Sequence, residues 1–280
     1  MSTLETNASH NPFFLYGTAW KEDRTAHLTS LAIEAGFRGI DTANQRKHYF
    51  EAAVGEGLLT AYDRLGLSRE ALWLQTKFTH QGGQDHRLPY DPRAPIYEQV
   101  LSSFESSLRH LHTDWIDSYV LHGPSLREGL ADQDWSAWEA MEELYLQGKT
   151  RALGVSNVSA RQLKLLLENC RVAPRYVQNR CYASRGWDRD TRQICSAYGI
   201  TYQGFSLLTA NRDVWESEMI SKLARHHHCT PAEVIFSFAL AHQMLPLTGT
   251  TNAQHMERDL QSSATMLSDQ HLKLIEHIIA

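Results

Sequence analysis

The chain alternates short runs that favour β-strands with segments of helical periodicity, and this alternation limits the folds open to it. Eight such runs lie along the 280 residues, at positions 14–18, 37–41, 72–77, 116–122, 150–155, 175–178, 200–205 and 245–248. Alternating strands and helices favour a parallel sheet, because each helix carries the chain back to the start of the next strand. Eight strand-and-helix units predict an α/β fold of the (β/α)8 type, a TIM barrel, and a doubly wound open sheet is the structural alternative.

Helix signals stand between the runs. Apolar side chains recur at i, i+3, i+4 and i+7 over residues 28–35, and Gly36 stands where a helix would end. Ser159 and Gln162 have the spacing of a capping box, and Pro231 suits the first turn of another helix. Because no linker or low-complexity segment divides the chain, we predict one barrel domain over residues 1–280, with a short N-terminal extension.

Composition argues against several classes of function. Lys and Arg number 27 against 32 Asp and Glu, which gives a net charge of −5, whereas nucleic-acid binders are usually basic. The sequence has no apolar run of about 18 residues and no secretory signal at its start. The four cysteines are widely spaced, which predicts reduced thiols. We therefore expect a cytoplasmic protein, a monomer or weak homo-oligomer, that binds a small molecule rather than nucleic acid or a membrane.

Three polar residues close successive runs. Asp41 ends the second run, Lys77 the third and His122 the fourth. Each alone has an ordinary structural explanation, but in a barrel the carboxyl ends of all strands meet at one rim, where active sites lie. A lysine paired with an aspartate in a partly dry pocket keeps its charge and lowers the pKa of a nearby phenol toward the range of a general acid. The only tyrosine in the loop after Asp41 is Tyr49.

Several motifs carry a resemblance to a known family. They are GFRGIDTA at residues 36–43 with Tyr49, Glu51, Val54 and Gly55, LWLQTK at 72–77, DSYVLHGP at 117–124, GKTRALGVSN at 148–157 and VQN at 177–179. In this order, from about Gly17 to Leu260, the chain resembles the aldo-keto reductase family. The resemblance implies a (β/α)8 barrel that reduces aldehydes or ketones to alcohols by hydride transfer from a nicotinamide cofactor. The cofactor implied is NADPH, with NADH less expected.

The resemblance also implies a catalytic tetrad of Asp41, Tyr49, Lys77 and His122. Tyr49 would donate a proton to the carbonyl oxygen, and Lys77, held by Asp41, would lower the pKa of that phenol. His122 would orient and polarise the carbonyl group. The substrate pocket implied consists of Trp20, Tyr49, His122 and Gly123. Trp187 is a further candidate for the pocket mouth, with ordinary packing as its alternative.

The cofactor site follows from the same resemblance. Ser156, Asn157 and Gln178 would hydrogen-bond the nicotinamide carboxamide, and Phe205 would stack on the nicotinamide ring. The whole set implied for the cofactor is Gly17, Thr18, Asp41, Ser156, Asn157, Gln178, Phe205, Ser206, Thr250, Asn252 and Arg258.

The sequence also departs from the family pattern. The spacing from Asp41 to Tyr49 is longer than usual, and Gly123 stands where the family commonly has tryptophan. Gly249 and His255 replace a lysine and an arginine commonly found around the cofactor's 2′-phosphate. Arg258 and a helix N-terminus could supply part of that binding.

Two other patterns carry less weight. The run RHHHC at residues 225–229 suggests a metal site, but consecutive histidines on a helix point in different directions, so we predict no metal. Gly55 and Gly57 imitate part of a dinucleotide fingerprint, yet they lie inside a helical segment.

Two alternatives to an active reductase stay open. The first is a catalytically silent, cofactor-binding relative that acts as a regulatory subunit, although such a protein need not keep the tetrad. The second, weaker alternative is an isomerase or aldolase barrel that uses Lys77 as a Schiff base. It requires a neutral amine, which Asp41 opposes.

Overall fold

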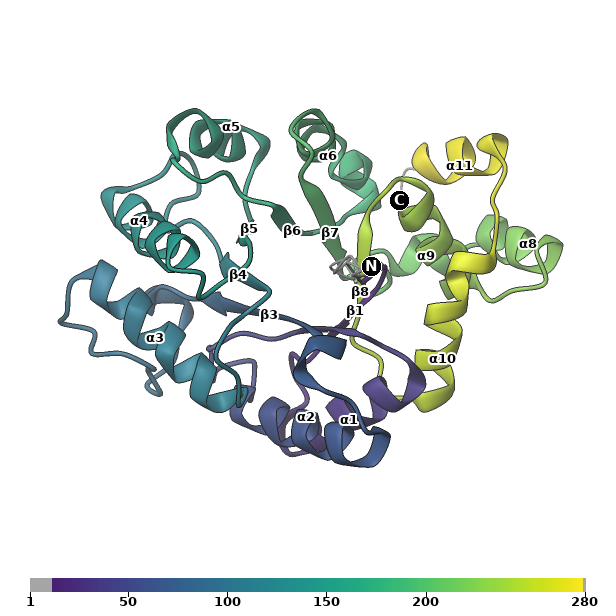
Figure 1. Ribbon diagram of the computed structural model, residues 1–280. Coiled ribbons are helices and arrows are strands. Elements are labelled where there is room, and N and C mark those ends of the chain that lie inside the picture. Colours follow the sequence, from purple (N-terminus) through teal and green to yellow (C-terminus); the bar gives the residue numbers. More distant parts are fainter. Residues whose placement is uncertain (1–11, 279–280) are drawn as a thin grey trace, which may run out of the picture.

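Eight parallel strands close into a single barrel in the computed structural model, which describes residues 12–278 (Figure 1). The strands are β1 (Leu15–Gly17), β2 (Gly39–Asp41), β3 (Trp73–Phe78), β4 (Ser118–Leu121), β5 (Leu153–Ser156), β6 (Tyr176–Arg180), β7 (Thr201–Phe205) and β8 (Leu245–Thr248). Each strand pairs with the next along the chain, and β1 pairs with β8 to complete the circle. The predicted (β/α)8 barrel is confirmed and the open sheet is excluded. The expected N-terminal extension falls before residue 12, outside the described residues.

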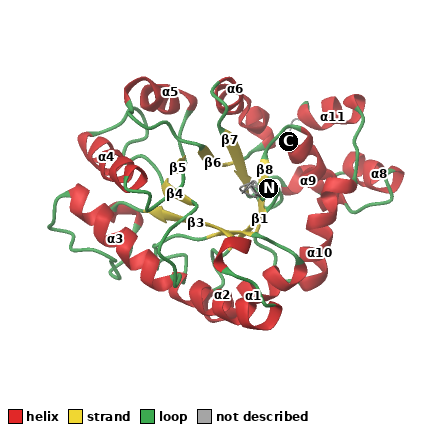
Figure 2. Ribbon diagram, in the orientation of Figure 1, coloured by secondary structure: helices red, strands yellow, loops and turns green. Residues whose placement is uncertain are grey.

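The helices form a ring outside the strands (Figure 2). They are α1 (Thr25–Ala35), α2 (Glu51–Leu65), α3 (Ile96–His110), α4 (Asp132–Leu146), α5 (Ala160–Asn169), α6 (Arg189–Ala197), α7 (Arg212–Trp215), α8 (Glu218–His226), α9 (Pro231–Ala241), α10 (Ala253–Gln261) and α11 (Asp269–Glu276). Three of them, α7 to α9, lie between β7 and β8, and α11 follows the last barrel helix. Through residues 12–278, no helix combines the length and the apolar character that a bilayer crossing requires.

The predicted helix boundaries have the expected local chemistry. α1 ends at Gly36, whose φ of 115° places it in the left-handed region that glycine adopts easily. Ser159 accepts a hydrogen bond from the Gln162 N–H at the start of α5. Thr230 does the same for Glu233 at the start of α9, where Pro231 occupies the first turn.

The two ends of the barrel interior differ in polarity. At the amino ends of the strands, a small apolar cluster of Leu15, Trp73, Tyr176 and Leu245 fills the interior. Further along the strands, polar side chains replace it, and the large apolar core lies between the barrel and its helices. Because the apolar cluster closes one end, a ligand reaches the interior polar groups only from the carboxyl ends of the strands.

The glycines that imitate a dinucleotide fingerprint serve helix packing. Gly55 lies in α2, where an added Cβ would stand 1.8 Å from the backbone oxygen of His110 at the end of α3. Gly57 also lies in α2, and a Cβ added there would stand 2.5 Å from the backbone oxygen of Ala26 in α1. The absence of side chains lets the backbones of neighbouring helices approach closely.

This close approach yields a stability prediction. Gly55→Ala should lower the free energy of unfolding by about 1–3 kcal/mol, because the overlap exceeds the gain in helix propensity. The measurement is urea unfolding followed by circular dichroism. Gly82→Ala is the matched control, because its Cβ would meet no atom within 4 Å. Equal stability of the two variants would contradict the packing role of Gly55.

Candidate active site

A buried ion pair lies in the polar part of the barrel. The Lys77 ammonium of β3 donates to Asp41 Oδ1 of β2 at 2.7 Å and to the Thr42 carbonyl oxygen at 2.8 Å. Both side chains are almost completely buried. Burial lowers the pKa of Lys77, and the Asp41 carboxylate opposes that shift. The pair therefore holds a positive charge inside the barrel together with its counter-ion.

Three glutamines extend this polar layer across the barrel. Gln75 and Lys77 are two residues apart on β3, so both point inward. The Gln75 amide donates to Asp41 Oδ1 at 2.6 Å and to Gln203 Oε1 at 2.8 Å. The Gln178 amide donates to the same two acceptors at 3.0 and 2.9 Å. The sequence analysis missed Gln75 and Gln203, and the available signal was an uncharged polar residue inside each of two predicted strands.

Tyr49 lies beside the ion pair and His122. Its ring meets the His122 ring edge-on, with centroids 5.9 Å apart, and the Lys77 Nζ is 5.3 Å from the Tyr49 ring centroid. The additional residues of the loop after Asp41 form a turn, in which the Tyr49 N–H donates to the Gln45 carbonyl oxygen at 2.9 Å. All four residues proposed for the tetrad therefore come together.

The electrostatics of Tyr49 differ from the expectation. We expected Lys77 to lower the pKa of the phenol, but burial and the Asp41 carboxylate raise it. Burial is the larger cause, because it disfavours the charged phenolate, and the negative charge of Asp41 acts in the same direction. In this arrangement Tyr49 carries its proton across the physiological pH range, as a proton donor must.

His122 is held by a hydrogen bond from outside the predicted site. Its Nδ1 is 2.7 Å from Thr79 Oγ1, and Thr79 in turn accepts a hydrogen bond from the Tyr90 hydroxyl on its carbonyl oxygen. Burial, Lys77 and His48 lower the pKa of His122 well below its usual value. The imidazole is therefore neutral and can donate or accept one hydrogen bond at Nε2.

A large cavity opens above these groups, with a volume of about 1890 Å³. Residues predicted for the site that line it are Gly17, Trp20, Asp41, Tyr49, His122, Gly123, Ser156, Asn157, Gln178, Phe205, Ser206, Thr250 and Arg258. Lys77, Thr18 and Asn252 are not in the lining. Lys77 lies beneath it, Thr18 is buried and donates to the Asp41 carbonyl oxygen at 3.0 Å, and Asn252 caps α10 through the His255 N–H.

The residues proposed for the carboxamide form a continuous polar wall. The Asn157 amide donates to the His122 carbonyl oxygen at 2.8 Å and to Ser156 Oγ at 3.1 Å. Gln178 follows on the neighbouring strand, in register with Ser156. Beside this wall, the Phe205 ring lines the cavity, with the Arg180 guanidinium 5.6 Å from its centroid.

Basic side chains lie at the β8 end of the cavity. Arg258 and His255 line it, and Lys21, which the sequence analysis missed, donates its ammonium to the Gly249 carbonyl oxygen. Asp259 lies there too, and burial raises the pKa of its carboxyl to about 7. This end of the cavity is therefore suited to an anionic group.

The mouth of the cavity is built from loops. Trp20 is 68% exposed and stacks obliquely on His48, with ring centroids 4.1 Å apart. The long loop after β3 contributes residues 80–83 and 92–95, except Arg93, to the lining. Trp187, in contrast, is fully buried, so its packing alternative is the one observed.

The sequence model of the aldo/keto reductase family matches residues 13–280. Among curated proteins, a 9,11-endoperoxide prostaglandin H2 reductase of Trypanosoma cruzi is 27% identical, covering 91% of this chain and 82% of its own length. A glyoxal reductase of Bacillus subtilis is 29% identical, with 88% and 82% covered. The solved structure of the aldose reductase from Schistosoma japonicum superposes with a TM-score of 0.82 at 22% identity, covering 99% of this chain and 91% of that one.

The lowered pKa of His122 predicts a pH dependence of stability. Below about pH 6.5 the unfolded chain binds a proton at this histidine while the folded chain does not, so acidification favours unfolding. Between pH 6.5 and 5, His122→Gln should lose less stability than the wild type, by up to about 1.4 kcal/mol per pH unit. Urea unfolding across this range measures the difference, and parallel pH curves would contradict it.

Proposed function

The chain belongs to the aldo/keto reductase family, and on that premise we propose that it reduces aldehydes or ketones to alcohols with NADPH, using Tyr49 as the proton donor. The observation that carries the proposal is the meeting of Tyr49, His122 and the Asp41–Lys77 pair at the floor of one cavity. A relative named as a glyoxal reductase supports carbonyl reduction as the general activity.

The residues present fit a nicotinamide dinucleotide. The cavity volume of about 1890 Å³ exceeds the roughly 300–1,000 Å³ of common small-ligand sites, which leaves room for a dinucleotide and a substrate. Ser156, Asn157 and Gln178 would hold the carboxamide, and Phe205 offers an aromatic face for the nicotinamide ring. Lys21 and Arg258 would hold the phosphate groups at the other end.

The bound cofactor supplies the hydride, and the chain's own residues supply the proton and the orientation. Tyr49 keeps its hydroxyl protonated and would donate to the carbonyl oxygen of the substrate as negative charge develops there. Lys77 then lies close enough to stabilise the phenolate that remains, since its Nζ is 5.3 Å from the ring centroid.

His122 has a positioning and polarising role in this proposal. Thr79 occupies its Nδ1, so Nε2 is the nitrogen available to the substrate. Because the ring is neutral, it would donate a hydrogen bond to the carbonyl oxygen without competing with Tyr49 as an acid. Gly123 has no side chain, and a Cβ added there would stand 3.4 Å from the Asn157 Cβ. The absence of a side chain leaves space in this part of the cavity wall for a bulky substrate.

A catalytically silent, cofactor-binding subunit is the second candidate. It shares the fold and the cofactor residues, so neither decides between the two. The buried Asp41–Lys77 pair favours the enzyme. Its desolvation penalty about cancels its attraction, so it adds little to the stability of the fold, whereas its charge serves the proposed catalysis.

Substitution of the proton donor tests the proposal. Tyr49→Phe should lower kcat by about 10²–10⁴-fold and leave NADPH affinity nearly unchanged, because only the hydroxyl is removed. The measurement is the loss of reduced nicotinamide absorbance with glyoxal and a reactive aromatic aldehyde. Tyr198→Phe is the matched control, since Tyr198 is 64% exposed and lies outside the cavity. A rate within about tenfold of the wild type would place the proton donor elsewhere.

The cofactor preference has its own test. NADPH should bind more tightly than NADH, and Arg258→Ala should weaken NADPH at least about tenfold while changing NADH little, because the guanidinium would contact only the 2′-phosphate. Fluorescence titrations with both cofactors measure this. An equal loss for both would mean that Arg258 contacts a part that the two cofactors share and not the 2′-phosphate, and no binding of either would contradict the proposed activity.

A further inference from the structure

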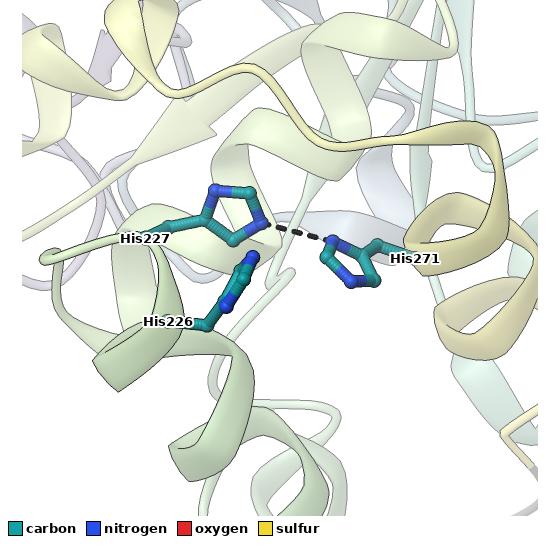
Figure 3. A group of neighbouring side chains, drawn as sticks. All are labelled: His226, His227 and His271. Atoms are coloured by element: carbon teal, nitrogen blue, oxygen red, sulfur yellow. Dashed lines mark hydrogen bonds between the residues drawn. The ribbon is translucent and has the colours of Figure 1, made fainter.

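Three histidines, from the end of α8 and the first turn of α11, meet on the outside of the barrel (Figure 3). His226 is the last residue of α8, His227 follows it, and His271 lies in the first turn of α11. None of the three lines the active-site cavity. In Figure 1, α8 and α11 occupy the same side of the molecule, outside the strands.

The expectation that consecutive histidines point apart is wrong for His226 and His227. It considered the helix alone, whereas the rings of both residues turn toward His271 of α11, as Figure 3 shows. His271 could not be paired with them from the sequence, because it lies 44 residues beyond His227.

The three rings are close enough to share one small ligand. His227 Nε2 and His271 Nδ1 are 2.9 Å apart, joined by a hydrogen bond. The ring centroids are 4.9 to 5.4 Å apart, and the ligating nitrogens of all three residues lie within 4.8 Å of one another. Within residues 12–278, no carboxylate or thiol belongs to the group.

This arrangement suits a metal cation better than protons. A hydrogen bond between two imidazoles needs at least one neutral ring, and two protonated rings would repel each other at this distance. One cation can bind the lone pairs of all three rings at once, which protons cannot do.

We propose that His226, His227 and His271 bind one divalent transition-metal ion of the Zn²⁺ class, with water as the remaining ligand. Neutral imidazole is a common ligand of Zn²⁺, Cu²⁺ and Ni²⁺, and three histidines with an open position form a known tetrahedral set for zinc. Zn–N bonds of about 2.0–2.1 Å place tetrahedral nitrogens about 3.3 Å apart. The His227–His271 pair opens slightly to reach this spacing, and the exposed His226 side chain moves inward.

The backbone under each ligand is already held in place. The His227 N–H donates to the Leu223 oxygen at 2.9 Å, and the His271 N–H donates to Ser268 Oγ at 3.3 Å. α11 is joined to the barrel wall by a buried hydrogen bond of 3.1 Å from Trp187 Nε1 to the Ile275 oxygen. A metal ion here ties α11 to α8, so the site acts on stability rather than on the carbonyl chemistry.

Zinc titration of the chelator-treated protein, made without a histidine tag, tests the proposal. Calorimetry should give one Zn²⁺ per chain, and His271→Gln or His227→Gln should weaken binding at least about tenfold. Glutamine at position 271 keeps a side chain suited to the first turn of α11. At Zn²⁺ concentrations about 100-fold above Kd, the Tm of the wild type should rise by about 5 °C, and that of His271→Gln should not.

Two controls separate this site from other histidines. His277→Gln replaces an exposed histidine just after α11 that is not in the cluster, and it should bind zinc like the wild type. His122→Gln should also keep the site. Binding that survives in His271→Gln but is lost in His122→Gln would assign the ion to the cavity and overturn the proposal. One ion per two chains would overturn a site complete within a single chain.

Discussion

The Asp41–Lys77 ion pair inside the barrel is the interaction on which the site depends. Removing one partner of such a pair typically costs about 3–5 kcal/mol, because it leaves an uncompensated charge away from water. A layer of glutamines supplies hydrogen bonds to the buried pair, and two of them donate to Asp41. The pair, its glutamines and the Thr42 carbonyl oxygen together fix where positive charge lies in the interior.

The rest of the site is arranged around that charge. An apolar cluster closes the barrel below it, and the cavity opens above it. Tyr49 and His122 approach from two different loops, and their edge-on ring contact places both next to Lys77. Burial acts in opposite senses on the two rings: it keeps the phenol protonated and the imidazole neutral. One desolvated environment thus yields a proton donor and a neutral hydrogen-bonding group side by side.

Much of the site could be predicted from the sequence, because the position of a residue relative to the end of its own strand or helix is a local property. Asp41, Lys77 and His122 each come at or just after the end of a strand, and the carboxyl ends of parallel strands share one rim in a barrel. Capping residues such as Ser159 and Thr230 act within one turn of their own helix, so their roles were visible in the sequence. The direction of the Tyr49 pKa shift was not, because it depends on how deeply the phenol is buried and on how close the Asp41 carboxylate lies to it.

The sequence by itself determined the eight-fold alternation, the single barrel and the identity of the residues at its rim, since periodicity and caps are properties of neighbouring residues. Only the tertiary structure decided which distant side chains share an environment. Gln75 and Gln203 meet because β3 and β7 face each other across a closed barrel. His271 meets His227 because α11 packs beside the end of α8. Such contacts depend on how complete elements pack, and no spacing along the chain encodes them.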